Sequence, residues 1–477
     1  MPGEVITTIS PTTNKPILTR HGLSPPEILQ LGTTAQAAFK AFRKSHASLS
    51  SRQQIIAKAL SLVLEKQDVL ARELTEQMGR PIAYTAKEIT TAVKRAEYMN
   101  SIAPEVLSQD ATIPGQPEEG FKRYITRRDP VGVVLVIFAW NYPYLILVNS
   151  LIPALLAGCS VILKPSPQTP TVVEHVVDIF AQAGLPRDVI QYLHCGNPLD
   201  LRPLITSEDV NHICFTGSVA AGIAIQTLAA TRVSCSVGLE LGGKDPAYVR
   251  RDVDAAWAAE EIVDGAIFNS GQSCCAIERV YVHEDVYDKF VDAAKTILAG
   301  YRLGDPLDES TQLGPVVSRR AVETIRAQVA DALAKGAKDE TPQGVESFTS
   351  PQGPSEGNWV PPTLLTHVNH SMAVMREETF GPVIPVQKVG SDEEAIALMN
   401  DSQFGLTASI WTKDVARGEE LCGQVEAGTV FVNRADFPAP DLAWTGWKDS
   451  GKGVTLSRVG FEQFVKVKSY HVKAYPR

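Results

Sequence analysis

The chain has 477 residues, 44% of them hydrophobic and 21% charged, and a formal net charge of -9. This length suggests two or three domains, and the composition is typical of a soluble globular protein and excludes a mainly disordered one. The acidic balance leaves no basic surface for nucleic acid or for an anionic membrane. We therefore expect small molecules or other subunits as partners.

Seven cysteines are present, with no Cys-x-x-Cys pair and no His/Cys spacing typical of a zinc site. They predict reduced thiols, no bound metal and a cytoplasmic location. The N-terminal run MPGEVITTIS has neither the apolar core of a secretory signal nor an arginine-rich presequence, so the mature protein is predicted to begin near Met1.

Helical periodicity dominates residues 25–103. Pro25 can open the first helix, Ser50 can cap the next, and Gly79 with Pro81 ends it before another begins. A polar connector over 110–120 follows. These first helices are predicted to serve packing.

Residues 131–163 contain no charged side chain, a run longer than a bilayer span needs. Polar or helix-breaking residues interrupt it, namely Asn141, Pro143, Asn149, Pro153 and Gly158. We therefore expect no membrane span, but a buried strand, a helix that starts at Pro143, and a second strand.

From Val131 onward, strands and helices alternate, which predicts a doubly wound parallel sheet. The predicted strands are Val131 to Ala139, Ser160 to Leu163, Val189 to Leu193, His212 to Phe215 and Ser236 to Leu239. A second α/β unit is predicted after Gly243, with helices near 253–268, 284–298 and 318–334 and strands near 279–282 and 383–389.

Two further runs alternate polar and apolar residues, Phe121 to Arg128 and Phe464 to Tyr475. Each is predicted to be a strand exposed on one side, and the two could pair within or between subunits. Lys338 to Asn358 is polar and rich in Gly, Pro and Ser, so we expect a surface excursion there.

Polar side chains follow the first two central strands. Open α/β sheets bind ligands at the carboxyl ends of their strands. Asn141, in Trp140-Asn141-Tyr142-Pro143, is thus a candidate oxyanion donor, although a helix cap is an equal alternative. Lys164 ends the next strand and could bind a ribose or phosphate or be a solvated lysine.

The run Phe215-Thr216-Gly217-Ser218 places small residues at a strand-to-helix turn, where free N–H groups attract a pyrophosphate. The Gly-x-x-x-x-Gly spacing to Gly222 is by itself a poor dinucleotide signal. In Gly271-Gln272-Ser273-Cys274-Cys275 a turn presents a cysteine that could attack a carbonyl, with a carboxylate elsewhere as base. Packing is the alternative for such a pair of cysteines.

The chain resembles the aldehyde dehydrogenase superfamily, from about residue 25 to the C-terminus. The ordered motifs are Trp140-Asn141-Tyr142-Pro143, Lys164-Pro165-Ser166, Phe215-Thr216-Gly217-Ser218, Glu240-Leu241-Gly242-Gly243-Lys244, Gly271-Gln272-Ser273-Cys274 and Glu377-Glu378-Thr379-Phe380-Gly381-Pro382-Val383. The resemblance implies an NAD(P)-binding domain (1–109 and 131–242), a catalytic domain (243–456) and an oligomerisation element (110–130 and 457–477). It also implies a homodimer or homotetramer.

The resemblance implies that Cys274 is the nucleophile, with Cys275 as a packing neighbour, and that Glu240 is the general base. Attack on an aldehyde gives a thiohemiacetal, whose oxyanion needs donors such as the Asn141 amide and the Cys274 backbone N–H. Hydride loss then gives a thioester, and water activated by Glu240 hydrolyses it to the carboxylic acid.

By the same resemblance, Glu378 and Phe380 hold the nicotinamide ribose and ring. The remaining cofactor contacts are Trp140, Lys164, Ser166, Gly217, Ser218 and Leu241. In many NAD-preferring relatives an acidic residue binds the adenosine ribose at the position that Pro167 occupies here. The cofactor is therefore expected to be NAD or NADP, with NAD slightly favoured.

The substrate-facing candidates are Tyr142, Asn149, Ser273 and Arg434. Asn149 stands where many relatives place an aromatic residue, and with Arg434 it suggests a polar or acidic aldehyde. An Arg434–Asp436 ion pair with a purely structural role is an equal alternative. Two alternative functions remain, a CoA-acylating enzyme, for which Glu240 is unnecessary, and a catalytically silent protein on the same scaffold, which does not need Cys274.

Overall fold

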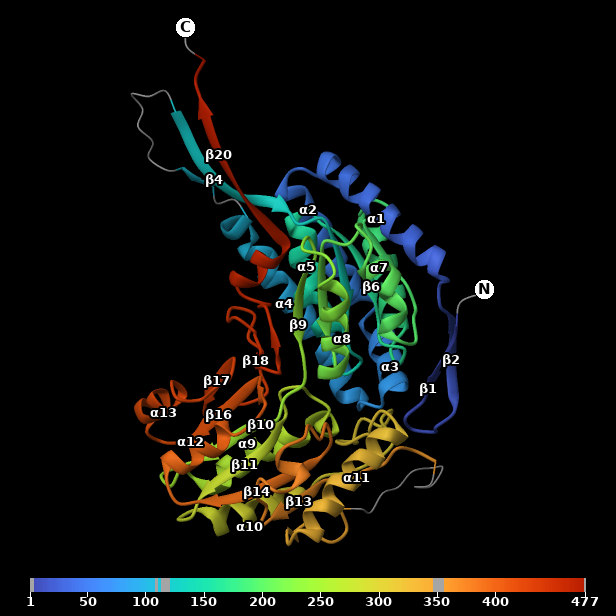
Figure 1. The fold of residues 1–477 in the computed structure, drawn as a ribbon. Helices are drawn as coiled ribbons and strands as arrows, with labels where there is room; N and C mark the ends of the chain where they lie inside the picture. Colours follow the sequence, from blue (N-terminus) through green and yellow to red (C-terminus); the bar gives the residue numbers. More distant parts are fainter. Residues whose placement is uncertain (1–3, 108–109, 113–120, 346–355, 476–477) are drawn as a thin grey trace.

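The computed structural model describes residues 4–107, 110–112, 121–345 and 356–475. Figure 1 shows two large helix-covered sheets, one above the other, with a long strand pair that projects from the upper part. This mixed α/β architecture confirms the predicted fold class. Among the described residues, no helix combines the length and apolar character that crossing a bilayer requires.

The N-terminal segment begins with a two-stranded hairpin that the sequence did not predict, β1 (Val5–Ile9) and β2 (Pro16–His21). The predicted helical region follows, as α1 (Pro25–Ser45), α2 (Leu49–Glu65), α3 (Gln67–Met78) and α4 (Ile82–Leu107). One detail was wrong, because α2 is capped by Ser48, which accepts a hydrogen bond from the Ser51 N–H, and not by Ser50. Gly79, with φ 83°, ends α3 as expected.

The first sheet has the order β19-β9-β8-β5-β6-β7, with β19 antiparallel and the others parallel. Its central strand β5 has β6 on one side and β8 on the other, so the winding direction reverses at β5, where such sheets bind ligands. The five predicted strands are confirmed. Their bounds are β5 (Val133–Ile137), β6 (Ser160–Lys164), β7 (Ile190–Tyr192), β8 (His212–Thr216) and β9 (Ser236–Glu240), joined by β19 (Gly451–Lys452).

Both faces of this sheet are buried, which explains the long uncharged run. Val134 and Val136 pack with the helices α2 to α6, whereas Leu135 and Ile137 face a second core with α1, α7 and α8. A strand between two helix layers has no solvated face and is apolar throughout. These helices are α5 (Pro143–Ala157), α6 (Thr171–Ala183), α7 (Arg202–Ile205) and α8 (Val219–Ala229).

The second sheet has the order β12-β13-β14-β11-β10-β16-β17 and is parallel except for β12. Its strands are β10 (Asp245–Val249), β11 (Ile277–His283), β12 (Lys338–Asp339), β13 (Thr363–Thr366), β14 (Val383–Val389), β16 (Thr407–Trp411) and β17 (Thr429–Val432). Its helices are α9 (Ala255–Ile267), α10 (Tyr287–Leu298), α11 (Arg319–Ala334), α12 (Asp392–Asn400) and α13 (Val415–Cys422). The predicted strands and helices of this unit are confirmed within a few residues.

The surface excursion predicted from Lys338 begins as the edge strand β12, and residues 346–355 of it lie outside the described residues. The connector predicted from Asp110 begins as a short strand, β3 (Asp110–Thr112), and 113–120 likewise lie outside. Two further short strands, β15 (Phe404–Gly405) and β18 (Trp447–Lys448), pair antiparallel with each other.

The two predicted exposed strands pair within the chain. β4 (Phe121–Pro130) lies antiparallel to β20 (Val465–Lys473), with Phe121 opposite Lys473, and β3 adds to the other side of β4. Figure 1 shows this ribbon extending away from the sheets. One long edge of β20 therefore has no partner strand among the described residues.

Candidate active site

The loop that carries Cys274 lies between α9 and β11 and has an unusual backbone. Asn269, Ser270 and Gly271 have φ values of 54°, 56° and 72°, a conformation that only glycine adopts without strain. Buried hydrogen bonds hold it, since Ser270 Oγ donates to the Gly314 carbonyl at 2.8 Å. A side chain on Gly271 would lie 2.2 Å from the Gly381 oxygen, so only glycine fits there.

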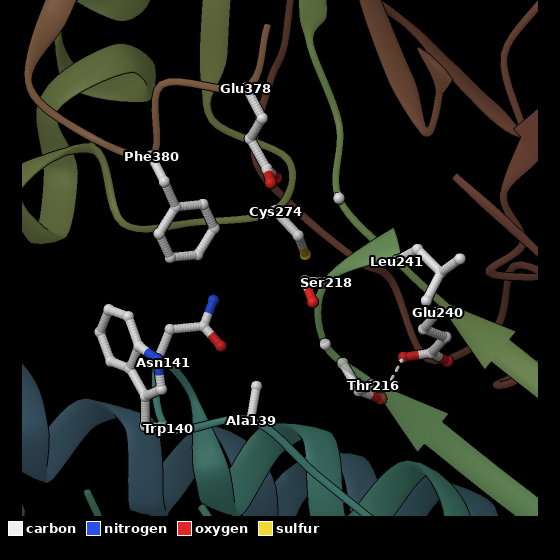
Figure 2. Close-up of a pocket in the computed structure, with 12 residues that line it drawn as sticks. Ala139, Trp140, Asn141, Thr216, Ser218, Glu240, Leu241, Cys274, Glu378 and Phe380 are labelled. Atoms are coloured by element: carbon white, nitrogen blue, oxygen red, sulfur yellow. Dashed lines mark hydrogen bonds between the residues drawn. The ribbon is translucent and has the colours of Figure 1, made fainter. Parts of the chain in front are cut away.

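A cavity of about 210 Å³ lies in front of this loop. Figure 2 shows that Cys274 points into it from one side and Trp140 and Asn141 from another. Nine of the residues singled out in the sequence line it: Trp140, Asn141, Gly217, Ser218, Glu240, Leu241, Cys274, Glu378 and Phe380. Six others lie outside its lining: Lys164, Ser166, Tyr142, Asn149, Ser273 and Arg434.

Asn141 is bound to the nucleophile loop and does not cap the helix. It is 3% exposed, and its Nδ2 donates to the Gln272 carbonyl at 3.3 Å. Helix α5 starts at Pro143 with Tyr142 at its cap position and no side-chain cap. The amide N–H groups of Asn141 are thus held two residues from the Cys274 position, where a negative oxygen formed by attack would be stabilised.

Arg80 joins three parts of the site. In the segment between α3 and α4, its guanidinium pairs with Glu88, donates to the Asn141 carbonyl, and donates to Asn269 Oδ1 at 3.1 Å. Arg80 and Glu88 have side chains only 1% exposed. The other Glu88 oxygen accepts from the Tyr144 N–H at 3.0 Å, so this buried pair fixes both the start of α5 and the nucleophile loop.

Glu240 ends β9 and is held away from the thiol in this structure. Its carboxylate accepts hydrogen bonds from the hydroxyls of Thr455 and, at 3.4 Å, Thr216, as Figure 2 shows for Thr216. Burial raises the pKa of Glu240, opposed by these hydroxyls and by the charge of Arg95. A buried carboxylate with a raised pKa is a suitable proton acceptor near neutral pH.

A second buried network positions Glu378 and Phe380. The Glu278 carboxylate accepts from Lys244 Nζ at 2.6 Å and from the N–H groups of Thr379 and Phe380 at 2.8 and 2.7 Å. Glu378 accepts from the Gly243 N–H at 3.0 Å, and burial with the nearby Glu278 charge raises its pKa to about 7. The segment with Gly243 and Lys244 and the segment with Glu378 and Phe380 are thus held in one fixed arrangement.

The residues at the carboxyl ends of the strands of the first sheet suit a dinucleotide. Helix α8 opens at the cavity with Ser218 as its cap, so its N-terminal N–H groups face the space where a pyrophosphate would lie. Phe380 and Trp140 meet edge to face at 5.7 Å and bound the opposite side. Lys164 lies at the end of β6, where burial lowers its pKa.

The predicted substrate-facing residues do not form one group, because Ser273 lies beside Cys275, Asn149 is bonded to Arg95, and Arg434 lies at another cavity. Asp436 accepts hydrogen bonds from the Ser273 hydroxyl at 3.0 Å and from the Cys275 thiol at 2.8 Å. The proposed Arg434–Asp436 ion pair is absent from the described residues, because the Arg434 guanidinium lies over the Phe437 ring at 3.8 Å. Arg434 is exposed and lines a second cavity, of about 460 Å³.

Sequence reasoning missed Arg80, Glu88, Arg95, Glu278 and Thr455. One signal was available, because Glu88 and Arg95 lie on the apolar face of α4 among Ile89, Ala92 and Met99. A charged residue at a core position is costly unless it is paired, so it indicates a function or a network. The other three had no local signal.

The sequence matches the aldehyde dehydrogenase family over residues 2–470. It is 37% identical over 468 residues to an aldehyde dehydrogenase of Paenarthrobacter nicotinovorans, covering 97% of this chain and 99% of that protein. A solved NADP-dependent enzyme of E. coli is similar with a TM-score of 0.92 and 29% identity, covering 99% of this chain and 95% of the other. A betaine aldehyde dehydrogenase of Staphylococcus aureus, solved with NAD+, has a TM-score of 0.91 and 27% identity, covering 99% and 92%.

We expect Glu88→Gln to destabilise the protein, because it leaves the buried Arg80 without an anionic partner. Breaking such a pair costs about 3–5 kcal/mol of the free energy of unfolding. The midpoint of urea unfolding measures this loss. Glu76→Gln is the matched control, since its pair with Arg72 is exposed and contributes about 0.5 kcal/mol or less. Equal midpoints for the two variants would contradict the role of the Arg80–Glu88 pair.

Proposed function

Because the chain belongs to the aldehyde dehydrogenase family, we propose that Cys274 is its nucleophile, Asn141 its oxyanion donor and Glu240 its general base. The protein is an NAD(P)-dependent enzyme that oxidises an aldehyde to a carboxylic acid. The observation that carries these roles is that all three side chains line one cavity together with Glu378 and Phe380.

In the first step the Cys274 thiolate attacks the aldehyde carbon, which forms an S–C bond and a negative oxygen. Asn141 Nδ2 and the Cys274 backbone N–H then donate to that oxygen. Because Arg80 and the Gln272 carbonyl hold Asn141 in place, little reorganisation is needed as the charge develops. Collapse of the oxyanion expels a hydride, and the acyl group remains on sulfur as a thioester.

Glu240 acts in the second step. Its carboxylate removes a proton from a water molecule that attacks the thioester, and the C–S bond breaks to release the carboxylic acid and the thiolate. Thr216 and Thr455 hold the carboxylate at the edge of the same cavity, so it can act through water without contacting the sulfur. Of the alternatives, transfer to CoA would not use this base, and a silent protein would not use this nucleophile.

The cofactor residues are proposed on the same basis. When bound, the nicotinamide accepts the hydride. Glu378 and Phe380 are placed beside Cys274 to hold the ribose and ring, and Gly217, Ser218, Leu241 and Trp140 border the path toward the α8 N-terminus. Lys164 and Ser166 lie at the end of the neighbouring strand β6, where the adenosine ribose would reach. We infer that the cofactor is NAD or NADP, with NAD slightly favoured.

Tyr142, Asn149, Ser273 and Arg434 are proposed to face a polar or acidic aldehyde. Ser273 and Asn149 are buried and hydrogen bonded, whereas the Tyr142 hydroxyl is buried without a partner. An unpaired buried hydroxyl is costly, so a polar substrate group there would relieve that cost. Arg434 lies at the surface of the second cavity, where it could contact the substrate before the substrate reaches Cys274.

For the organisation of the chain we propose an NAD(P)-binding domain (1–109 and 131–242), a catalytic domain (243–456) and an oligomerisation element (110–130 and 457–477). The exposed β20 edge supports a homodimer or homotetramer, because an unpaired strand edge favours pairing with another chain. The unpaired cysteines are consistent with the proposed cytoplasmic location.

We expect Glu240→Gln to slow thioester hydrolysis by about 10²- to 10⁴-fold while hydride transfer remains. Rapid mixing with aldehyde and cofactor should then give a burst of one equivalent of reduced cofactor, followed by a slow steady rate. In the unchanged enzyme the steady rate should fall with decreasing pH, at a pH above the usual glutamate range, because the pKa of Glu240 is raised and only its ionised form accepts a proton.

Cys274→Ala serves as the control and should abolish both the burst and the steady rate. Cys422→Ala, which removes a partly exposed thiol elsewhere, should preserve both. A normal steady rate in Glu240→Gln would show that this residue is not the base.

We expect Pro167→Glu to shift cofactor use toward NAD. A carboxylate at this position would repel the 2′-phosphate of NADP, and like charges brought together cost several kcal/mol. The ratio of kcat/KM for NAD to that for NADP should therefore rise at least about tenfold, while the KM for the aldehyde stays unchanged. An unchanged ratio would place the adenosine ribose away from Pro167.

We expect the protein to have a mass of two or four times its 51.7 kDa in solution, as measured by light scattering. Val467 and Val472 on β20 are 59% and 48% exposed, so a partner subunit would cover them. The double substitution Val467→Glu with Val472→Glu should lower the mass toward that of the single chain. Retention of the larger mass would assign the subunit contact to another surface.

A further inference from the structure

Arg95 is a buried cation that no described carboxylate contacts, although the negative charge of Glu240 acts on it from beyond ion-pair distance. It lies on α4, is 5% exposed, and forms no ion pair with any described residue. Its hydrogen bonds go only to neutral oxygens: NH1 donates to Asn149 Oδ1 at 3.0 Å and the Leu145 carbonyl at 3.4 Å, and NH2 donates to the Pro438 carbonyl at 3.0 Å. Its Nε is buried and has no partner.

An arrangement of this kind is unfavourable for stability alone. A buried charge is costly unless an opposite charge compensates it, and an orphaned N–H adds a further cost. Burial lowers the pKa of Arg95 to about 10, which still leaves the guanidinium charged at neutral pH. Arg52 differs, because it is more exposed and its Nε and NH1 groups donate to the carbonyls of Leu156, His46 and Ala47.

The place of Arg95 relates it to the nucleophile. Leu145 and Asn149 are four residues apart on α5 and lie on one face of the helix, which begins two residues after Asn141. Arg95 contacts both of them, roughly 3–9 Å along the axis from the helix start at Pro143 at 1.5 Å per residue. Its third contact, Pro438, is two residues from Asp436, which binds Ser273 and Cys275 beside Cys274.

We propose that Arg95 is a specificity-determining residue. It binds the carboxylate of a substrate that has an aldehyde at one end and a carboxylate a few bonds away. The inference rests on the proposed function and names the substrate class of the same site. The bound carboxylate would supply an anion in direct contact with the guanidinium and accept from the orphaned Nε. The unpartnered hydroxyl of Tyr142, the residue after Asn141, is a second buried donor for an acceptor-rich substrate.

Glu240 acts on Arg95 through its charge but forms no ion pair with it. Asp436 is a second charge that competes with this assignment, because a carboxylate beside Cys275 would attract a cationic aldehyde instead. Its Oδ1 is already used by Ser273 and Cys275, and although burial raises its pKa to about 6, it stays mainly ionised at neutral pH. Arg95, by contrast, has an unused donor. The balance therefore favours an anionic substrate group.

The test compares kcat/KM for 5-oxopentanoate and 4-oxobutanoate with that for the uncharged pentanal and butanal and the cationic 4-aminobutanal. The unchanged enzyme should favour the carboxylated aldehydes. Arg95→Met should lower kcat/KM for these by roughly 10- to 100-fold, mainly through KM, with less than about threefold change for pentanal, because a charge-assisted hydrogen bond is lost. Arg95→Lys should recover part of the loss.

Asn149→Asp provides a second, isosteric variant in case Arg95→Met fails to fold. It places an anion 3.0 Å from the guanidinium, so it should lower kcat/KM for the carboxylated aldehydes while Arg95 remains in place. Arg52→Met is the matched control, a half-buried arginine on α2 that is bound to backbone carbonyls, and it should leave the preference for carboxylated over uncharged aldehydes unchanged.

The possible outcomes separate the two proposals. Equal losses for charged and uncharged aldehydes in Arg95→Met and Asn149→Asp would make Arg95 structural, or an electrostatic aid to Glu240, and would overturn the inference. A preference of the unchanged enzyme for 4-aminobutanal, or for none of the charges, would also overturn it while the proposed function stands. Absence of the burst predicted for Glu240→Gln would instead contradict the proposed function.

Discussion

The site depends on one buried ion pair, Arg80 with Glu88. Arg80 lies in the segment between two helices of the first half of the chain, yet it contacts the backbone of Asn141 and the side chain of Asn269 in the nucleophile loop. Because a guanidinium presents five N–H donors in a fixed plane, one residue can set the relative position of three segments. A lysine, with a single flexible donor group, could not fix the same geometry.

The strained nucleophile loop is tolerated because of that support. Three successive residues with positive φ are unfavourable in isolation. Here the loop backbone is held in this conformation by hydrogen bonds of Asn269, Ser270 and Gln272 and by the close approach of Gly381. The Glu278–Lys244 pair performs the equivalent task on the cofactor side. The two buried pairs therefore hold two faces of the cavity that Cys274 lines.

The charged groups near the nucleophile are unequally compensated. Lys244 and Arg80 each have a carboxylate partner, whereas Arg95 has none, and burial raises the pKa of Glu240, Glu378 and Asp436. A folded protein retains such uncompensated groups where a ligand or a proton transfer completes them. This distribution separates residues that build the site from residues that act in it.

The sequence alone determined the fold class and the five parallel strands around the uncharged run, and its motifs picked out Cys274, Glu240 and Asn141 as candidates, which the structure brings to one cavity. It could not determine that Asn141 binds Gln272 instead of capping α5, that Arg434 stacks on Phe437, or that Arg80 and Arg95 belong to the site. Except for the Arg434–Phe437 contact, which is local, those facts depend on contacts between residues 50 to 343 positions apart, which no local pattern encodes. Only packing of the two sheets against the first helices brings those residues together.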